Sequence, residues 1–159
     1  MERNTYTINL GTPKKAQHLL VNKEGCLDIK LKSKKEVLSE IVSICRKEYN
    51  CKECKTISLE NDTNDNVVLD NGIVLINKLV ENISNNYLVF LRLKYPIMFG
   101  RNNIKSDLIF TIFSPKNMDT FNRLQILSKL SRVLNVNNFR EKIRGAVNAE
   151  DVIALFFTT

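Results

Sequence analysis

The sequence predicts an α/β domain in which a central β-sheet is covered by helices on both faces. Three nearly continuous apolar runs have the length of strands, and they occupy residues 73–76, 87–93 and 107–113. Such runs are typical of strands that are buried on both faces, whereas a half-exposed strand alternates apolar and polar residues. Segments with apolar residues at helical spacing lie before and after these runs, so helices can cover both faces.

Length and composition are those of one ordinary globular domain. The chain has 159 residues, of which 43% are hydrophobic and 26% charged, and it contains only 5 Gly and 3 Pro. A chain of this length can bury about two-thirds of its extended surface in one core. The formal net charge is +7. Its basic residues are scattered rather than gathered in a run, which is typical of a solvated surface and disfavours nucleic-acid binding.

Residues 1–24 are expected to form an N-terminal extension or an edge strand, ahead of a main domain over residues 25–159. The segment 5–10 (TYTINL) alternates β-forming and polar side chains, as an edge strand would. His18, the only histidine, is expected in a short helical turn. Because the N-terminus lacks the apolar core of a signal peptide and no apolar run reaches membrane-spanning length, we expect a cytoplasmic protein without membrane insertion.

A half-buried strand and a helix are expected next. Residues 26–31 (CLDIKL) alternate apolar and polar side chains. Ser33 then fits the N-cap position of a helix, and Glu36 completes a capping box, in which both side chains satisfy backbone N–H groups at the helix start. Apolar residues at helical spacing continue this helix to about Glu48.

Three cysteines in this region raise the question of a metal site. Cys45, Cys51 and Cys54 lie close together in sequence, and Cys26 is further away. A zinc site needs four convergent ligands, but Cys51 and Cys54 form the only Cys-x2-Cys pair, and Cys45 is expected to face the core from its helix. Structural or incidental thiols are therefore favoured over a zinc site or a redox pair, and no cofactor is expected.

The run at residues 73–76 is the best candidate for a strand that carries a functional site. Gly72 permits a tight turn before this run, and Asn77 follows it. Ligands of open α/β sheets bind at the carboxyl ends of strands, so we expect Asn77 at such an end. The acidic segment 60–66 before the turn is typical of a solvated loop, because its aspartates lack the spacing of a calcium-binding loop.

Turn and cap residues divide the C-terminal half into two strands and three helices. Turns are expected at Asn85-Asn86 and Ser114-Pro115. The helices are predicted after an N-cap at Asp119 or Thr120, over residues 136–144 with an end at Gly145, and from Asn148 through Phe156.

Three segments resemble the enzyme IIA domains of the bacterial phosphotransferase system, type 2, the group of the mannitol/fructose and nitrogen-regulatory members. Residues 72–77 (GIVLIN) are similar to the Gly-hydrophobic-Ala-hydrophobic-Pro-His signature of the family. Residues 93–100 (LKYPIMFG) are similar to its Leu-x-x-Pro-Ile-x-Phe-Gly turn, with Pro96 in the turn, and residues 123–130 (RLQILSKL) to its His-Leu-x-x-Leu-x-x-Leu helix. The resemblance spans roughly residues 26–156 and implies a three-layer sandwich with a central mixed β-sheet flanked by helices.

The sequence departs from this family at the residues that carry its chemistry. The phosphoryl-accepting histidine falls on Asn77, the proline before it on Ile76, and the second active-site histidine on Arg123. An unprotonated imidazole nitrogen has the lone pair that attacks phosphorus, whereas the lone pair of an amide nitrogen is delocalised. We therefore expect the fold without phosphoryl transfer. Asn77 and Arg123 become candidate anion-binding residues, and the simpler interpretation is that both are ordinary surface residues.

The leading hypothesis is a regulatory module that binds a protein partner, as the resemblance to nitrogen-regulatory members implies. The implied partners are phosphotransferase components such as HPr, or a regulated kinase or transporter. Two alternatives stay open: a phosphocarrier with an unorthodox acceptor such as His18, and a basic nucleic-acid- or zinc-binding module. Paired carboxylates, Gly-rich phosphate loops and histidine-based metal motifs do not occur with useful spacing.

Overall fold

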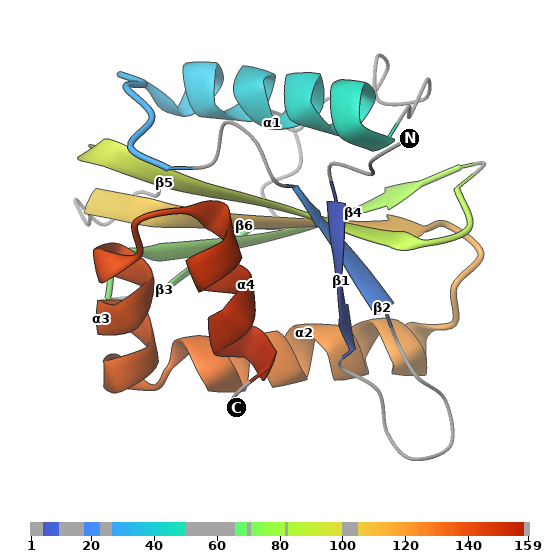
Figure 1. The fold of residues 1–159 in the computed structure, drawn as a ribbon. Coiled ribbons are helices and arrows are strands. Elements are labelled where there is room, and N and C mark those ends of the chain that lie inside the picture. Colours follow the sequence, from blue (N-terminus) through green and yellow to red (C-terminus); the bar gives the residue numbers. More distant parts are fainter. Residues whose placement is uncertain are drawn as a thin grey trace.

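The chain forms one mixed β-sheet between two layers of helices (Figure 1). The computed structural model describes residues 5–9, 18–22, 27–49, 66–69, 71–81, 83–99 and 105–157. Within these ranges the strands are β1 (Thr5–Asn9), β2 (His18–Asn22), β3 (Asn66–Leu69), β4 (Ile73–Val80), β5 (Asn86–Met98) and β6 (Lys105–Pro115). The helices are α1 (Lys34–Tyr49), α2 (Thr120–Leu134), α3 (Asn137–Gly145) and α4 (Ala149–Phe157).

The central strands of the sheet run in both directions. The strand order is β1-β2-β5-β6-β4-β3. β4 is parallel to β6, β6 is antiparallel to β5, and β5 is parallel to β2. The outer pairs, β1 with β2 and β3 with β4, are antiparallel. The central mixed sheet that the family resemblance implies is therefore confirmed.

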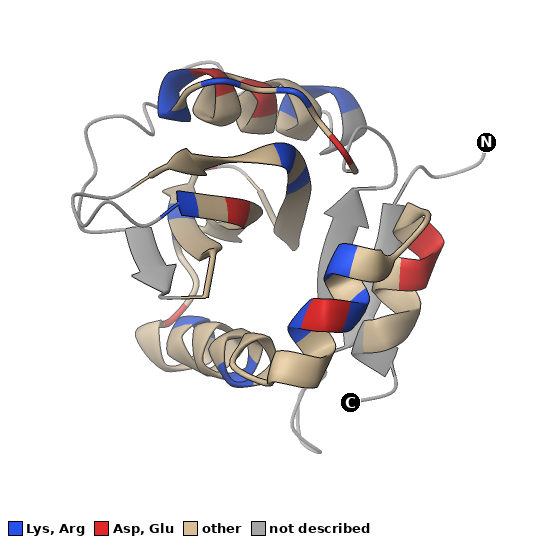
Figure 2. Ribbon diagram, turned by 90° about the vertical axis from the view of Figure 1, so that its left-hand side faces the viewer, with Lys and Arg blue, Asp and Glu red and all other residues tan. Residues whose placement is uncertain are grey.

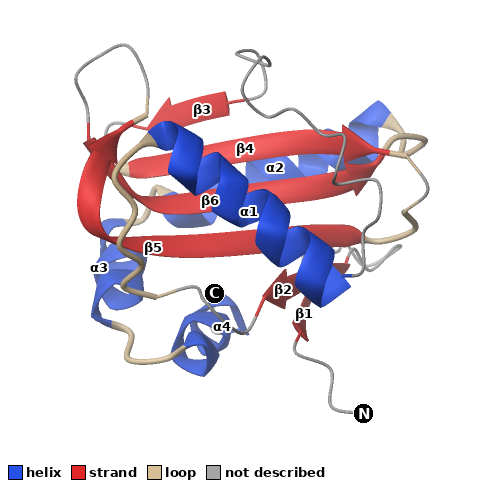
Figure 3. Cartoon of the chain, turned by 90° about the horizontal axis from the view of Figure 1, so that it is seen from above, coloured by secondary structure: helices blue, strands red, loops and turns tan. Residues whose placement is uncertain are grey.

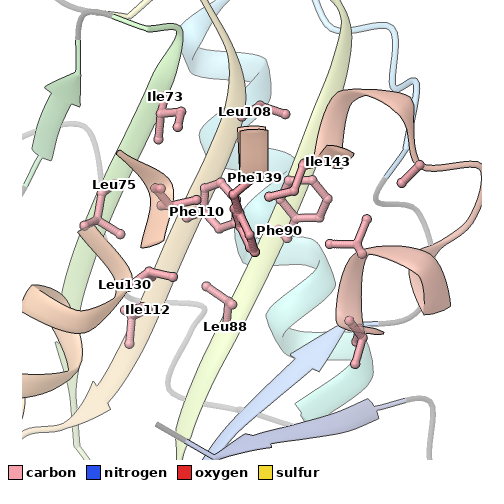
Figure 4. Close-up of a cluster of buried hydrophobic side chains, with 14 of the residues drawn as sticks. Ile73, Leu75, Leu88, Phe90, Leu108, Phe110, Ile112, Leu130, Phe139 and Ile143 are labelled. Carbon is pink, nitrogen blue, oxygen red and sulfur yellow. The ribbon is translucent and has the colours of Figure 1, made fainter. Parts of the chain in front are cut away.

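Helices cover both faces of the sheet, with α1 on one face and α2, α3 and α4 on the other (Figures 1 and 3). Successive strand residues point to opposite faces, and the apolar ones form two buried clusters. The cluster under α1 includes Val37, Ile41, Val74, Ile76, Val89 and Ile109. The other includes Ile73, Leu75, Leu88, Phe90, Phe110, Ile112 and Leu130 (Figure 4). The prediction of strands buried on both faces is confirmed.

Helix α1 begins with the predicted cap. The backbone N–H of Glu36 donates to Ser33 Oγ at 3.2 Å, and Glu36 Oε2 accepts from the backbone N–H of Lys32 at 2.7 Å. The glutamate thus reaches one residue further back than in the usual capping box, in which it meets the N-cap residue itself. Both contacts satisfy backbone donors at the start of the helix, so the predicted boundary is confirmed.

Two predictions in the N-terminal part are wrong. His18 begins strand β2 and does not lie in a helical turn. Residues 27–31 are not a regular strand, because only Ile29 forms a β-bridge, to Leu93. Asp28 has a φ of 55°, which takes the backbone out of the extended region. The alternation at the start of the chain does correspond to a strand, β1, which lies at the sheet edge.

Strand β5 is longer than the sequence predicts. Asn86 is its first residue rather than part of a turn, and Pro96 lies inside it rather than in the family's turn. The pairing of β5 with β6 is irregular between Arg92 and Ile97. Such a bulge can accommodate a proline, because a residue without an N–H cannot donate to the regular ladder.

The turn before β4 requires glycine. Gly72 has a φ of 86°, a conformation that side chains with a Cβ rarely adopt. A Cβ there would lie 2.7 Å from Arg144 Nη2 and 2.9 Å from Asp107 Oδ1. Arg144 and Asp107 form an ion pair at 2.9 Å, and Arg144 also donates to the carbonyl of Asn71 at 2.7 Å. The predicted tight turn is confirmed, and a charged pair packs directly against it.

Arg92 joins helix α3 to the sheet. Its side chain is buried, and Nη1 donates to the carbonyls of Ile143, Arg144 and Ala146 at 3.0, 3.1 and 2.7 Å. Nη2 lies 3.2 Å from both carboxylate oxygens of Asp28. One guanidinium therefore binds three carbonyls at and just after the end of α3, where carbonyls lack the usual helical partner; that of Ile143 also accepts from the backbone N–H of Ala146 at 3.3 Å.

The remaining helix boundaries agree with the sequence. Asp119 caps α2, because its Oδ1 accepts from the backbone N–H of Asn122 at 2.8 Å. Helix α3 ends at Gly145, and Asn148 Oδ1 accepts from the N–H of Asp151 at 2.8 Å at the start of α4. The predictions on Cys51, Cys54 and the acidic residues 60–65 lie outside the described residues. No described helix is long and apolar enough to cross a membrane.

Candidate functional site

Asn77 lies within strand β4, on the face covered by α2. It is the fifth residue of a strand that continues to Val80, so the expectation that Asn77 follows the strand is wrong. The strand is longer because Lys78 and Leu79 continue the pairing with β6. Asn77 is 7% exposed. A buried polar side chain at this depth must find hydrogen-bond partners.

The carboxamide of Asn77 is held in one orientation. Nδ2 donates to the carbonyl of Ile112 at 3.0 Å and to Ser114 Oγ at 3.1 Å. Because a carbonyl can only accept, the nitrogen must face Ile112. Both N–H groups of the amide are then used, and Oδ1 points the other way.

Arg123 meets the free oxygen of this amide. It is the fourth residue of α2, and Nη1 lies 3.4 Å from Asn77 Oδ1. This distance is at the long end for a hydrogen bond, so the interaction is weak. The structure thus brings together the two residues that the sequence singled out, although they are 46 positions apart.

The N-terminus of α2 beside Arg123 is already occupied by a negative side chain. Asp119 accepts from Asn122 twice, at Oδ1 from the backbone N–H (2.8 Å) and at Oδ2 from Nδ2 (2.6 Å). The backbone N–H of Arg123 donates to the carbonyl of Asp119 at 3.2 Å. The carboxylate offsets the positive end of the helix dipole, so Arg123 supplies the charge at this site.

Sequence reasoning missed two polar residues beside Asn77. Ser114 and Asn86 lie on neighbouring strands, β6 and β5, and strand alternation places both on the face of Asn77. They face each other, since the adjacent pair is Phe113 with Tyr87. Asn86 is 7% exposed, and its Oδ1 has no hydrogen-bond partner among the residues that the structure describes. The available signal is a polar residue next to each apolar run, but the local sequence predicts turns at both positions.

The other candidate residues are not part of this site. Cys45 is fully buried in the cluster under α1, on the opposite face of the sheet, as expected for a core thiol. In the described part of the chain no three His, Cys, Asp or Glu side chains come together as metal ligands. His18 lies at the start of β2.

A hollow lies at the ends of β4 and β6, apart from the Asn77–Arg123 contact. It has a volume of about 430 Å³ and is lined by Glu81, Ile83, Lys116 and Asn117. Lys116 Nζ and Glu81 Oε1 form an exposed ion pair at 2.9 Å. Because the two charges neutralise each other, this hollow offers little to a charged ligand.

The chemistry that the site can perform follows from these contacts. Ser114 is the hydroxyl at the site, and in the described structure its oxygen accepts from Asn77 rather than facing a base. A serine needs an adjacent base to become a nucleophile. Arg123 retains N–H donors that can hold an anion. Among the described residues, the arrangement therefore offers an anion-binding group, Arg123, and a serine hydroxyl engaged by Asn77.

Solved structures with a similar fold include a nitrogen regulatory protein and the mannitol enzyme IIA. The nitrogen regulatory protein IIA-Ntr from Neisseria meningitidis is 22% identical, with a TM-score of 0.70 over 82% of this chain and 91% of that chain. Enzyme IIA mannitol from Escherichia coli, solved in complex with phosphorylated enzyme IIB mannitol, is 15% identical, with a TM-score of 0.64 over 84% and 94%. A crystal structure of Escherichia coli IIA mannitol gives 15% and 0.61 over 82% and 94%.

The sequence itself places the chain among these domains. Residues 21–158 match the family described as "Phosphoenolpyruvate-dependent sugar phosphotransferase system, EIIA 2". The match covers most of the 159 residues, and the chain belongs to this family. Among curated proteins no relative matches.

Proposed function

We propose that this chain is an enzyme IIA-type domain that binds a protein partner and does not relay phosphate. The observation that carries the proposal is the hydrogen bonding of Asn77, the residue that the family resemblance places at the phosphoryl-accepting position. Both hydrogens of its amide nitrogen are donated, to Ile112 and Ser114. The nitrogen lone pair is delocalised into the carbonyl, so it cannot attack a phosphoryl group.

Protein binding is the family activity that survives without the histidine. Escherichia coli IIA mannitol has been solved in complex with its phosphorylated IIB partner. A site of the same kind that keeps a cation, Arg123, and lacks a nucleophile can still recognise such a surface. The proposed partners are cytoplasmic: phosphotransferase components such as HPr, or a regulated kinase or transporter.

A phosphotransfer assay tests the proposal directly. The protein is incubated with phospho-HPr and its intact mass is measured. We expect no increase in mass, because Asn77 accepts no phosphoryl group. A gain of one phosphoryl group would overturn the proposal. If that gain disappeared in His18→Ala, the chain would be a phosphocarrier that uses His18.

Placing histidines at positions 77 and 123 tests whether the missing nucleophile alone prevents phosphorylation. In Asn77→His, an imidazole N–H can donate to the carbonyl of Ile112 in place of Nδ2, which is 3.0 Å from that oxygen. The other ring nitrogen then keeps its lone pair. We expect phosphorylation of this variant, and more of it when Arg123→His is added, while the wild type stays unlabelled.

A further inference from the structure

Arg123 has fewer partners than its chemistry allows. A guanidinium has five N–H donors, yet among the described residues the Arg123 side chain meets one acceptor, Asn77 Oδ1, at 3.4 Å. Arg144, by comparison, binds both carboxylate oxygens of Asp107 and a backbone carbonyl. Arg123 is also half-buried, which makes an incompletely paired charge costly. These features indicate that Arg123 is prepared for an anionic group from outside the described structure.

We propose that Arg123 pairs with a single carboxylate on a protein partner, and that Phe121 and Leu124 contact apolar side chains beside that carboxylate. This inference rests on the proposed function and adds the chemistry of the partner surface. It predicts an aspartate or glutamate flanked by apolar residues, rather than a basic or phosphorylated segment.

The surrounding charges favour one negative charge over two. The Asp119 carboxylate already offsets the positive end of the α2 dipole, so the dipole attracts a second negative charge only weakly. Lys116 is engaged with Glu81 at 2.9 Å. Asn77 turns its Oδ1 toward Arg123 of α2, and this oxygen repels further anionic oxygens. A carboxylate matches the single guanidinium, whereas a phosphoryl dianion does not.

The exposed residues of α2 favour a macromolecular partner. Phe121 is 69% exposed and Leu124 is 53% exposed. Residues three apart lie on the same side of a helix, so the two form an exposed apolar pair in the first turns of α2, the part of the helix that also carries Arg123. Helix α2 contains three basic residues and no acidic one, so its ribbon in Figure 2 is tan with blue segments. An acidic surface with apolar side chains complements this helix in charge and in polarity.

Peptide selection provides the probe. Random peptides of about twelve residues, long enough to occupy a surface site of this kind, are selected on the wild-type protein and on Arg123→Gln in parallel. We expect the wild type to enrich peptides with Asp or Glu beside apolar residues, and Arg123→Gln to lose this enrichment. Equal enrichment on both proteins, or no acidic preference, would overturn the inference.

Titration of the best peptide measures the individual contributions. Arg123→Gln should weaken binding about tenfold, the range of one charge-assisted hydrogen-bonded pair. Phe121→Ala or Leu124→Ala should each weaken it several-fold. Arg132→Gln, on the exposed side of the same helix, is the matched control and should stay within about twofold, since exposed charges contribute little. A control loss equal to that of Arg123→Gln would show a non-specific charge effect and contradict the inference.

Two further arms test the ligand's charge. Arg123→Glu should lose the acidic peptide and bind its Glu→Lys counterpart, because the swap restores opposite charges. A phosphoserine in place of the glutamate should bind no better than the carboxylate. Tighter binding of the phosphopeptide by about tenfold or more would overturn the single-carboxylate assignment. The phosphotransfer assay is independent of these peptides, so failure here with no phosphorylation would remove only the inference.

Discussion

Two arginines on the same side of the sheet, Arg92 on β5 and Arg123 on α2, have opposite surroundings. Arg92, opposite the first half of β6, donates to three backbone carbonyls and binds Asp28. Arg123, beside the second half of β6, has within the described part of the chain one long side-chain hydrogen bond, to Asn77. A guanidinium whose N–H donors are paired within the protein stabilises the fold, whereas one with unpaired donors can bind a ligand. The comparison separates the end of the sheet where an arginine maintains the structure from the end that we propose as the binding site.

The largest expected effect comes from removing Arg92. Arg92→Met should lower the free energy of unfolding by about 3 kcal/mol, because buried carbonyls at the end of α3 lose their donor. Urea unfolding followed by circular dichroism measures the change. Lys94→Met, at an exposed position of the same strand, is the control. A loss below about 1 kcal/mol would contradict the structural role of Arg92.

The turn beside Arg144 gives the next largest effect. Gly72→Ala should cost about 2 kcal/mol, since the residue has a φ of 86° and its new Cβ would meet Arg144 and Asp107 within 3 Å. Gly145→Ala is a matched control, because a Cβ there has no neighbour within 4 Å. Equal losses in the two variants, measured by thermal unfolding, would show that the turn is not constrained as described.

Asn77 should have an intermediate effect on stability. Asn77→Ala removes a buried amide with two donated hydrogen bonds and should cost about 1 kcal/mol. Ser114→Ala should cost less, because Nδ2 keeps the carbonyl of Ile112 as its acceptor. Ser128→Ala, at an exposed position, provides the baseline in the same urea titration. If Ser114→Ala cost more than Asn77→Ala, the hydrogen-bond assignment would be wrong.

The smallest effect is expected at Arg123. Arg123→Gln should change the free energy of unfolding by less than about 0.5 kcal/mol, because it removes only one weak hydrogen bond. The same variant should lose the acidic peptides described above. A stability loss approaching that of Arg92→Met would show that Arg123 belongs to the structure rather than to a binding surface.

Much of the architecture could be predicted because local signals agreed with the final packing. The apolar runs of β4, β5 and β6 identified the strands that are buried on both faces. Ser33 and Asp119 marked helix starts, since their side chains accept backbone N–H groups. These signals depend on neighbouring residues, so they can be read from a single sequence.

The wrong predictions share a physical cause, which is dependence on distant partners. The alternation of residues 27–31 resembles a strand, but Asp28 has a positive φ and its carboxylate binds Arg92. Pro96 suggested a turn, and pairing with β6 draws it into a bulged strand. His18 was assigned to a helical turn, but the sheet includes it in β2. Tertiary pairing overrides local preference in each case.

The candidate site was predictable in part. The family resemblance indicated Asn77 and Arg123, and the two side chains do meet. The fixed orientation of the amide was not predictable, because it depends on the carbonyl of Ile112 and on Ser114. Asn86 was missed for the same reason, since its position opposite Ser114 follows from the register of β5 and β6.

The pairing of β2 with β5 has a consequence for synthesis on the ribosome. Strands β1 and β2 leave the ribosome first, but Leu19 pairs with Asn86, far along the chain. An isolated two-stranded ribbon is only marginally stable in water. Strand β2 therefore cannot pair with β5 until the middle of the chain has been synthesised. Until then the unpaired edge of the β1–β2 pair is exposed to other nascent strands.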